Sequence, residues 1–154
     1  MFGKTVGQYL GFQKVLLGLI VLVFLVRLGM SMAGTPNSVA RWVSVTVVML
    51  FGVLYYGVAV HTSGFGSYKQ LYPLVLFQSL VGEGLVALAI VLAIVTGTDN
   101  IYTAPEYSGG GDGKTWFHVG AHVVVAAIVF PLISWALSSV ILLVTKRLAP
   151  STAR

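Results

Sequence analysis

The sequence predicts an all-α integral membrane protein, a bundle of four transmembrane helices, and two observations support this prediction. Of the 154 residues, 57% are hydrophobic and only 8% are charged, whereas soluble domains carry about a quarter charged residues. The apolar residues are concentrated in four runs, at residues 12–32, 43–60, 71–96 and 117–145. Each run has about 18 residues or more, enough for a helix to cross roughly 30 Å of hydrocarbon. We therefore expect a single transmembrane domain over residues 1–154, with helices running up, down, up and down.

The first run, residues 12–32, also has features of a secretory signal peptide. Lys4 and Lys14 lie near its start, and the small residues Ser31 and Ala33 lie at its end. Arg27 near the end of the run is atypical of a signal peptide, and the run is long enough to span a bilayer. We expect it to be retained as a membrane helix, with cleavage as the alternative.

Turn-forming residues separate the first three helices. The turn at residues 34–38 follows the first run, and the glycine-containing loop at residues 61–70 follows the second. Pro73 is expected in the first turn of the third helix, where a missing backbone N–H is tolerated.

The last helix follows the longest connection, residues 97–115. Its glycine-rich part, residues 109–113, is expected to be flexible. Thr115 is the predicted N-cap of the last helix. Pro131 should kink that helix, because it cannot donate a hydrogen bond to the carbonyl of Ala127.

The basic residues predict the orientation in the membrane. Four spans place both termini on one side, together with Lys4, Lys14, Lys69, Lys146, Arg147 and Arg154. The other side carries Arg41 and Lys114. Short cytoplasmic loops are enriched in lysine and arginine, so both termini are predicted to be cytoplasmic in a multi-pass protein of the cell membrane. The net charge of +5 is not clustered beyond Lys146–Arg147, so nucleic acid is not an expected partner.

Three ionisable side chains inside the runs are predicted to lie at a similar depth. By helical rise, Glu83 is about 18 Å from Leu71, near the midplane, and Arg27 is about 22 Å from Phe12. His122 is about 9 Å below Trp116, whereas His61 belongs to the opposite surface. Such residues are costly in hydrocarbon and usually functional, so Glu83 and Arg27 are the candidates for ion or proton coupling.

The direction of each side chain follows from helical periodicity. Glu83 shares an arc with Gln78, Gly82 and Ala89, so it is expected to face protein, where a structural hydrogen bond is the plainer explanation. Arg27 lies opposite Gly11, Gly18 and Gly29. If these glycines mark the packing seam, Arg27 faces a partner subunit or lipid; direct contact with Glu83 is the alternative.

His118 and His122 share one face of the last helix and form a candidate metal site. Two imidazoles one turn apart, with Glu83 as a third ligand, suit zinc, copper or iron. Histidines near the lipid headgroups are the plainer explanation. One helix cannot supply both axial ligands of a haem in this spacing, and no cofactor is predicted.

No catalytic motif appears in the chain, and an enzyme is not expected. There is no cysteine nucleophile, phosphate-binding loop or nucleophile elbow. The first hypothesis is a non-catalytic subunit or homo-oligomer of a membrane complex, with lipid, a second copy or other membrane subunits as partners. The alternatives are a small ion- or proton-coupled transporter that uses Glu83, and a metal-binding or redox subunit that uses His118, His122 and Glu83.

Overall fold

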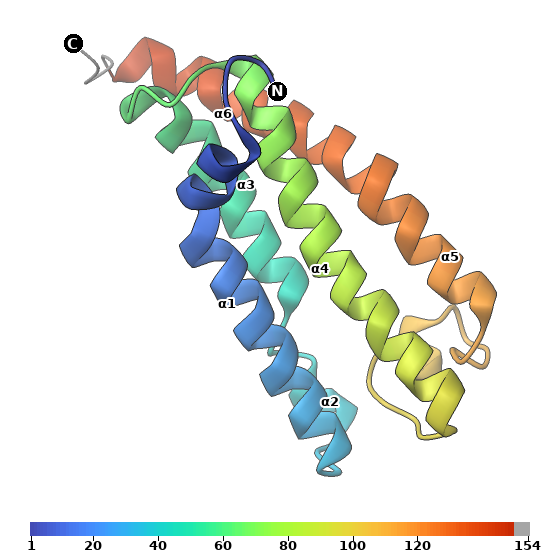
Figure 1. The fold of residues 1–154 in the computed structure, drawn as a ribbon. Coiled ribbons are helices and arrows are strands. Elements are labelled where there is room, and N and C mark those ends of the chain that lie inside the picture. The colour runs from blue at the N-terminus through green and yellow to red at the C-terminus, as the bar shows by residue number, and fades with distance from the viewer. Residues whose placement is uncertain (150–154) are drawn as a thin grey trace.

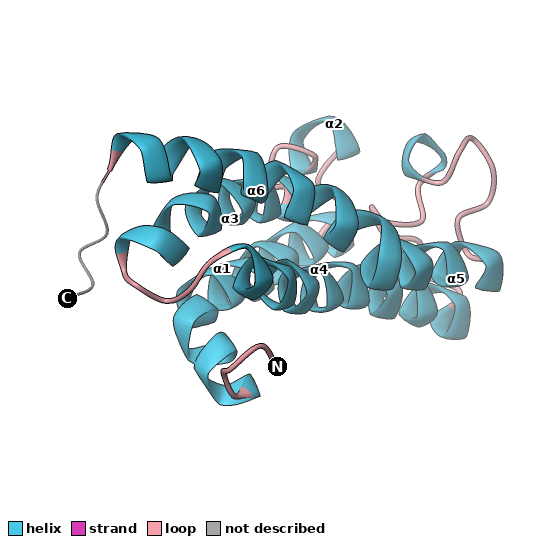
Figure 2. Ribbon diagram, turned by 90° about the horizontal axis from the view of Figure 1, so that it is seen from above, coloured by secondary structure: helices cyan, strands magenta, loops and turns pink. Residues whose placement is uncertain are grey.

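A computed structural model describes residues 1–149, and in this part of the chain it contains four helical segments long and apolar enough to span a membrane, as predicted. The described part consists of helices joined by loops (Figure 2). Successive long helices run in opposite directions, so the N-terminus and the end of the last helix lie at the same end of the bundle (Figure 1). We call this the terminal end, and we call the opposite end, which carries residues 97–115, the loop end. Arg154, which contributed to the predicted charge asymmetry, lies outside the described residues.

The long helices of the first two spans begin at side-chain caps. Helix α1 (Val6–Met32) starts at a capping box, in which Thr5 and Gln8 bond to each other's backbone N–H groups. The short α2 (Asn37–Ala40) precedes α3 (Val45–Thr62), which is capped by Ser44. Helix α4 (Tyr68–Thr96) begins three residues earlier than its apolar run.

The early start of α4 corrects the position predicted for Pro73. This residue lies in the second turn rather than the first. In that position its missing N–H leaves the carbonyl of Lys69 without a helical partner. The chain after α4 forms the 3-10 turn η1 (Pro105–Tyr107) at the loop end.

The last span is divided into α5 (Trp116–Val124), a π-helical turn η2 (Val125–Val129) and α6 (Phe130–Leu148). Thr115 caps α5 as predicted, by accepting the N–H of His118 at 3.1 Å. The distortion expected at Pro131 takes the form of the π turn, in which the N–H of Phe130 bonds to Val125 five residues back. Widening the helix just before the proline accommodates the hydrogen bond that Pro131 cannot make.

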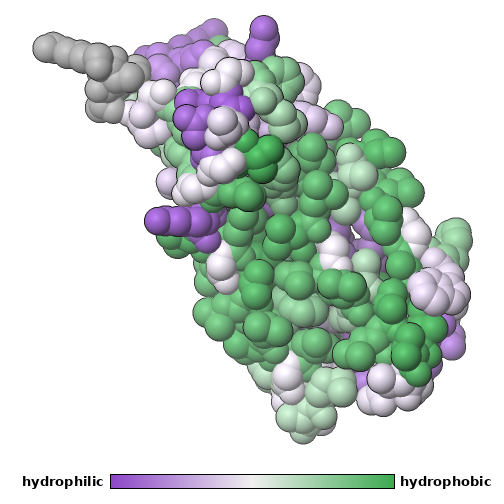
Figure 3. Space-filling view, viewed as in Figure 1, coloured by the Kyte–Doolittle hydropathy of each residue, from purple (hydrophilic) through white to green (hydrophobic). Residues whose placement is uncertain are grey.

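Helix α4 is the central helix, because it packs against α1, α3, α5 and α6. The buried apolar side chains form one cluster at the loop end and another at the terminal end. The loop-end cluster includes Phe24, Met49 and Ile90, and the terminal cluster includes Tyr56 and Leu142. Apolar residues cover most of the visible outer surface, and hydrophilic residues gather at the terminal end (Figure 3). This surface is suited to contact with lipid.

Close helix packing depends on a glycine of α3 rather than on the glycines of α1. A Cβ added at Gly57 would lie 2.6 Å from the Cβ of Ile141 and 3.0 Å from the carbonyl oxygen of Ser138. By contrast, a Cβ at Gly84 would have no atom within 4 Å apart from its own helix backbone and chain neighbours. Gly57 therefore allows α3 and α6 to approach each other.

We expect Gly57→Ala to lower the free energy of unfolding by about 1–3 kcal/mol, because α6 must move to make room for the methyl group. Gly84→Ala is the matched control and should leave stability unchanged or raise it by up to about 1 kcal/mol, since alanine favours a helix. Reversible unfolding in detergent micelles measures both. Equal stability of the two variants would contradict the packing described here.

Candidate functional site

Glu83 of α4 and His122 of α5 meet inside the bundle near its loop end. The distance from Glu83 Oε2 to His122 Nδ1 is 2.7 Å, which makes a charge-assisted hydrogen bond when the imidazole is protonated. The two side chains are 12% and 24% exposed. They come from neighbouring helices, so the bond joins α4 to the last span. A carboxyl group and an imidazole placed in this way can hold and release a proton.

Arg27 faces the interior, and the expectation that it faces a partner subunit or lipid was wrong. The residue is only 8% exposed. The buried face of α1 comprises Tyr9, Gln13, Ile20, Phe24 and Arg27. The glycines that we took for the packing seam point away from the bundle: a Cβ at Gly11, Gly18 or Gly29 would have no atom of another element within 4 Å. The inward face of α1 is therefore the one that carries Arg27.

The guanidinium of Arg27 lies between two tyrosine rings rather than against a carboxylate. Its central carbon is 5.1 Å from the ring centroid of Tyr102 and 5.3 Å from that of Tyr107. The ion pairs among residues 1–149 join Lys114 to Asp99 and Asp112, and His122 to Glu83. The direct contact between Arg27 and Glu83 that we weighed as an alternative is not among them.

These groups surround a small cavity, which we call the inner cavity. It has a volume of about 180 Å³ and is lined by Arg27, Val45, Thr46, Glu83, Val86, Tyr102, Tyr107 and His122. Arg27 Nε and the hydroxyl of Tyr102 are buried and have no hydrogen-bond partner in the described part of the chain. Burial raises the pKa of Tyr102 to about 12, against the opposing effects of the positive charge on Arg27 and of the N–H groups that its guanidinium offers to the phenol oxygen. The hydroxyl therefore remains a hydrogen-bond donor at neutral pH.

Two larger clefts adjoin the inner cavity. The arginine cleft, of about 760 Å³, shares Arg27, Thr46 and Tyr107 with it and also includes Arg41. The histidine cleft, of about 540 Å³, shares Tyr107 and His122 with it. Tyr107 borders all three spaces.

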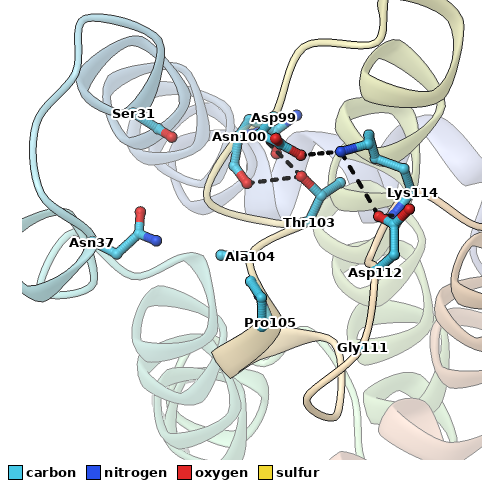
Figure 4. A pocket seen from close by; sticks show the side chains of 10 residues that line it. All are labelled: Ser31, Asn37, Asp99, Asn100, Thr103, Ala104, Pro105, Gly111, Asp112 and Lys114. Atoms are coloured by element: carbon cyan, nitrogen blue, oxygen red, sulfur yellow. Dashed lines mark hydrogen bonds and ion pairs between the residues drawn. The ribbon is translucent and has the colours of Figure 1, made fainter.

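Residues 97–115 supply the wall of the site at the loop end. Asn100 is buried, donates from Nδ2 to the carbonyl of Ala89 at 2.9 Å, and accepts the N–H of Tyr102 at 2.9 Å. Lys114 bridges Asp99 and Asp112 in the same segment (Figure 4). These contacts hold Tyr102 against the ends of the membrane helices.

Tyr102 and Tyr107 were not among the residues predicted from the sequence. The one available signal was the presence of two tyrosines in a connection otherwise rich in glycine and polar residues. Glu106, beside Tyr107, accepts a hydrogen bond from Asn37 at 2.9 Å, and hydrogen bonding lowers the pKa of this carboxyl. This bond ties the segment to α2.

A row of buried polar side chains continues from Glu83 toward the terminal end. Ser79 lies one helical turn from Glu83, and its hydroxyl has no partner within residues 1–149. Gln78 then donates to the carbonyl of Met49 at 2.8 Å, and farther along Tyr56 donates to Gln13 at 2.8 Å. We call Ser79, Gln78, Gln13 and Tyr56 the polar row. Unpaired polar atoms are costly in hydrocarbon, and bound water is the usual way to satisfy them.

The structure brings together two of the three predicted metal ligands. His118 places Nδ1 3.0 Å from the carbonyl oxygen of Gly113, and its ring centroid is 5.0 Å from that of His122. No group of three or more histidine, cysteine, aspartate or glutamate side chains in residues 1–149 is placed to hold a metal ion. A metal at Glu83, His118 and His122 stays a prediction. His61 belongs to the terminal end, where its Nε2 lies 3.0 Å from the carbonyl oxygen of Ala149.

We expect Asn100→Ala to loosen the loop segment that forms the wall of the site, because the substitution removes two hydrogen bonds and leaves the N–H of Tyr102 without its partner. The expected loss of stability is about 1–3 kcal/mol, with faster hydrogen exchange of residues 100–104 than in the wild type. Asn37→Ala is the control, since it removes one exposed hydrogen bond to Glu106. Unchanged exchange in Asn100→Ala would show that other contacts hold the segment.

Comparison of the chain with protein-family models, curated proteins and solved structures finds no match. The arguments for function therefore start from the geometry of the inner cavity and of the groups around it.

Proposed function

We propose that the protein is a small proton-coupled carrier of the cell membrane, in which Glu83 and His122 bind the coupling proton. The observation that carries this proposal is their 2.7 Å contact at the edge of the inner cavity. Ionisable residues inside membrane spans are rare and commonly lie on ion or proton pathways. Because Glu83 and His122 border the inner cavity, they can exchange a proton and also contact a solute bound there.

The charge of the pair supports this role. With one exchangeable proton between them, Glu83 and His122 together carry no net charge. After loss of that proton the pair carries a charge of −1, and Arg27, which lines the same cavity, offsets it. The charge of −1 on the pair is therefore tolerable inside a membrane, which a lone carboxylate would not be.

The polar row supports a route for the proton through the rest of the bundle. It extends from Ser79 to Gln13 and Tyr56, and the side chains of Gln13, Gln78 and Ser79 each have an unpaired buried atom within residues 1–149. In the proposed orientation the termini are cytoplasmic, the clefts at the loop end open outward, and the row leads toward the cytoplasm.

We expect Glu83→Gln and His122→Gln to reduce proton flux by about tenfold or more, since each variant removes one partner of the proton-binding pair. The measurement uses purified protein in liposomes that contain a pH-sensitive dye, with a membrane potential imposed and a panel of small solutes added outside. Glu106→Gln is the matched control, because this carboxyl is exposed and outside the spans. Wild-type flux no greater than that of protein-free liposomes, or equal flux in all variants, rules out the carrier.

A non-catalytic subunit or homo-oligomer is the second candidate, and one observation favours it. Helix α1 is the least buried of the four spans, and Gly11, Gly18 and Gly29 on it have no neighbouring element within 4 Å of an added Cβ. Small residues on an open helix face allow another membrane helix to approach closely.

We expect native mass spectrometry in detergent to show an oligomer or a co-purifying subunit if this second candidate is correct. Gly18→Leu should then dissociate it, because the larger side chain prevents close approach of the partner helix. Gly84→Leu on α4 is the control with the same change in an open position. A wild-type protein that is monomeric and free of partners excludes this candidate.

A further inference from the structure

We propose that the inner cavity binds a small organic monocarboxylate, with its carboxylate held by Arg27 and the Tyr102 hydroxyl and its apolar part against the cavity wall. The role of this ligand as a transported substrate rests on the proposed carrier function. Its binding can be measured without transport, so the binding site and the carrier function can fail separately.

The first step of the argument is the charge of the cavity. Arg27 is 8% exposed inside a membrane span, and the described residues place no carboxylate within 4.0 Å of its guanidinium. While a proton is held between Glu83 and His122, that pair has no net charge. The remaining side chains around the cavity are neutral tyrosines, Thr46 and two valines. Arg27 is thus an uncompensated buried charge, and such a charge is strongly unfavourable without an anion.

The second step is the set of unused donors. Arg27 and Tyr102 both line the inner cavity, and neither Arg27 Nε nor the Tyr102 hydroxyl has a hydrogen-bond partner in the described part of the chain. A carboxylate has two oxygens that each accept hydrogen bonds, and its planar shape matches a guanidinium. One carboxylate can therefore accept hydrogen bonds from both donors and also balance the positive charge of Arg27.

The third step is the size and the wall of the cavity. Its volume of about 180 Å³ is well below the roughly 300–1,000 Å³ of sites for drug-sized ligands, so the ligand must be small. Val45, Val86 and the two tyrosine rings line it. A strongly hydrated inorganic anion would gain nothing from these apolar groups, whereas the short chain of an organic acid would be desolvated favourably.

The fourth step is access. The arginine cleft opens onto the same guanidinium, because it shares Arg27, Thr46 and Tyr107 with the inner cavity. Arg41 at the cleft is exposed, and Glu106, the carboxylate in the cleft lining, is bonded to Asn37. Arg27 and Arg41 outweigh the single carboxylate of Glu106, so the lining of the cleft is net positive and attracts anions toward the site.

The test measures butyrate binding to the purified full-length protein in detergent at constant pH and ionic strength, by calorimetry and by the shift in melting temperature. We expect the wild type to bind butyrate, and Arg27→Gln to weaken binding by about tenfold or more. Tyr102→Phe should weaken it severalfold, since it removes one donor and keeps the ring. Arg147→Gln, the same substitution at the terminal end, should bind like the wild type.

A second readout separates a binding role of Arg27 from a structural one. If Arg27 awaits an anion, Arg27→Gln removes an uncompensated charge, so the ligand-free variant should melt at the same temperature as the wild type or higher. A lower melting temperature together with retained butyrate binding would show that Arg27 is structural and would overturn the proposal. Tyr102→Phe tests the site independently if Arg27→Gln fails to fold.

Matched ligands separate the chemical classes. Butanol has the chain without the charge and should not bind, and chloride and phosphate should bind more weakly than butyrate. Binding of phosphate or chloride as tight as that of butyrate would replace the organic acid with an inorganic anion and overturn the proposal. Absence of butyrate binding alongside Glu83-dependent proton flux refutes the carboxylate site alone. Arg27-dependent binding without proton flux refutes the carrier alone.

Discussion

The contact between Glu83 and His122 is the constraint on which the loop end of the bundle depends. It joins α4, the central helix, to α5 at 2.7 Å. In hydrocarbon no water competes for these groups, so each must remain near a partner or be neutralised. The pair forms one edge of the inner cavity, whose lining also includes Arg27 of α1 and Tyr102 and Tyr107 of residues 97–115.

The loop segment completes a site that the membrane helices leave open. Asn100 bonds back to Ala89 of α4, and Tyr102 packs in the loop-end cluster together with Phe24 and Ile90. Arg27 then lies between Tyr102 and Tyr107 instead of facing lipid. The result is a cationic group inside an aromatic enclosure, which differs from a simple helix-to-helix salt bridge.

Much of the fold was predictable, because it follows from length and hydrophobicity. The four spans, the cap at Thr115 and the distortion before Pro131 depend on local rules, and the structure has all three. The position of Pro73 was missed, because polar and aromatic residues before Leu71 extend α4 beyond its apolar run.

The site was predictable only in part, because its contacts depend on tertiary structure. Helical rise placed Glu83 and His122 at a similar depth, and the structure joins them. The direction of Arg27 was predicted wrongly, since glycines in a membrane helix mark either a packing seam or an open face, and the α1 glycines mark an open face. Tyr102 and Tyr107 reach the cavity through loop hydrogen bonds that no periodic pattern encodes.

The π turn at Val125–Val129 divides the last span into two halves that differ in their contacts with the bundle. On its terminal side, Ser138 bonds to the carbonyl of Val53 at 3.1 Å and anchors α6 to α3. On the other side, α5 carries His122 and has no buried residue of its own. A π-helical turn is a point at which a helix can bend. Bending there would swing the imidazole toward or away from the carboxyl group while the anchored half stayed in place.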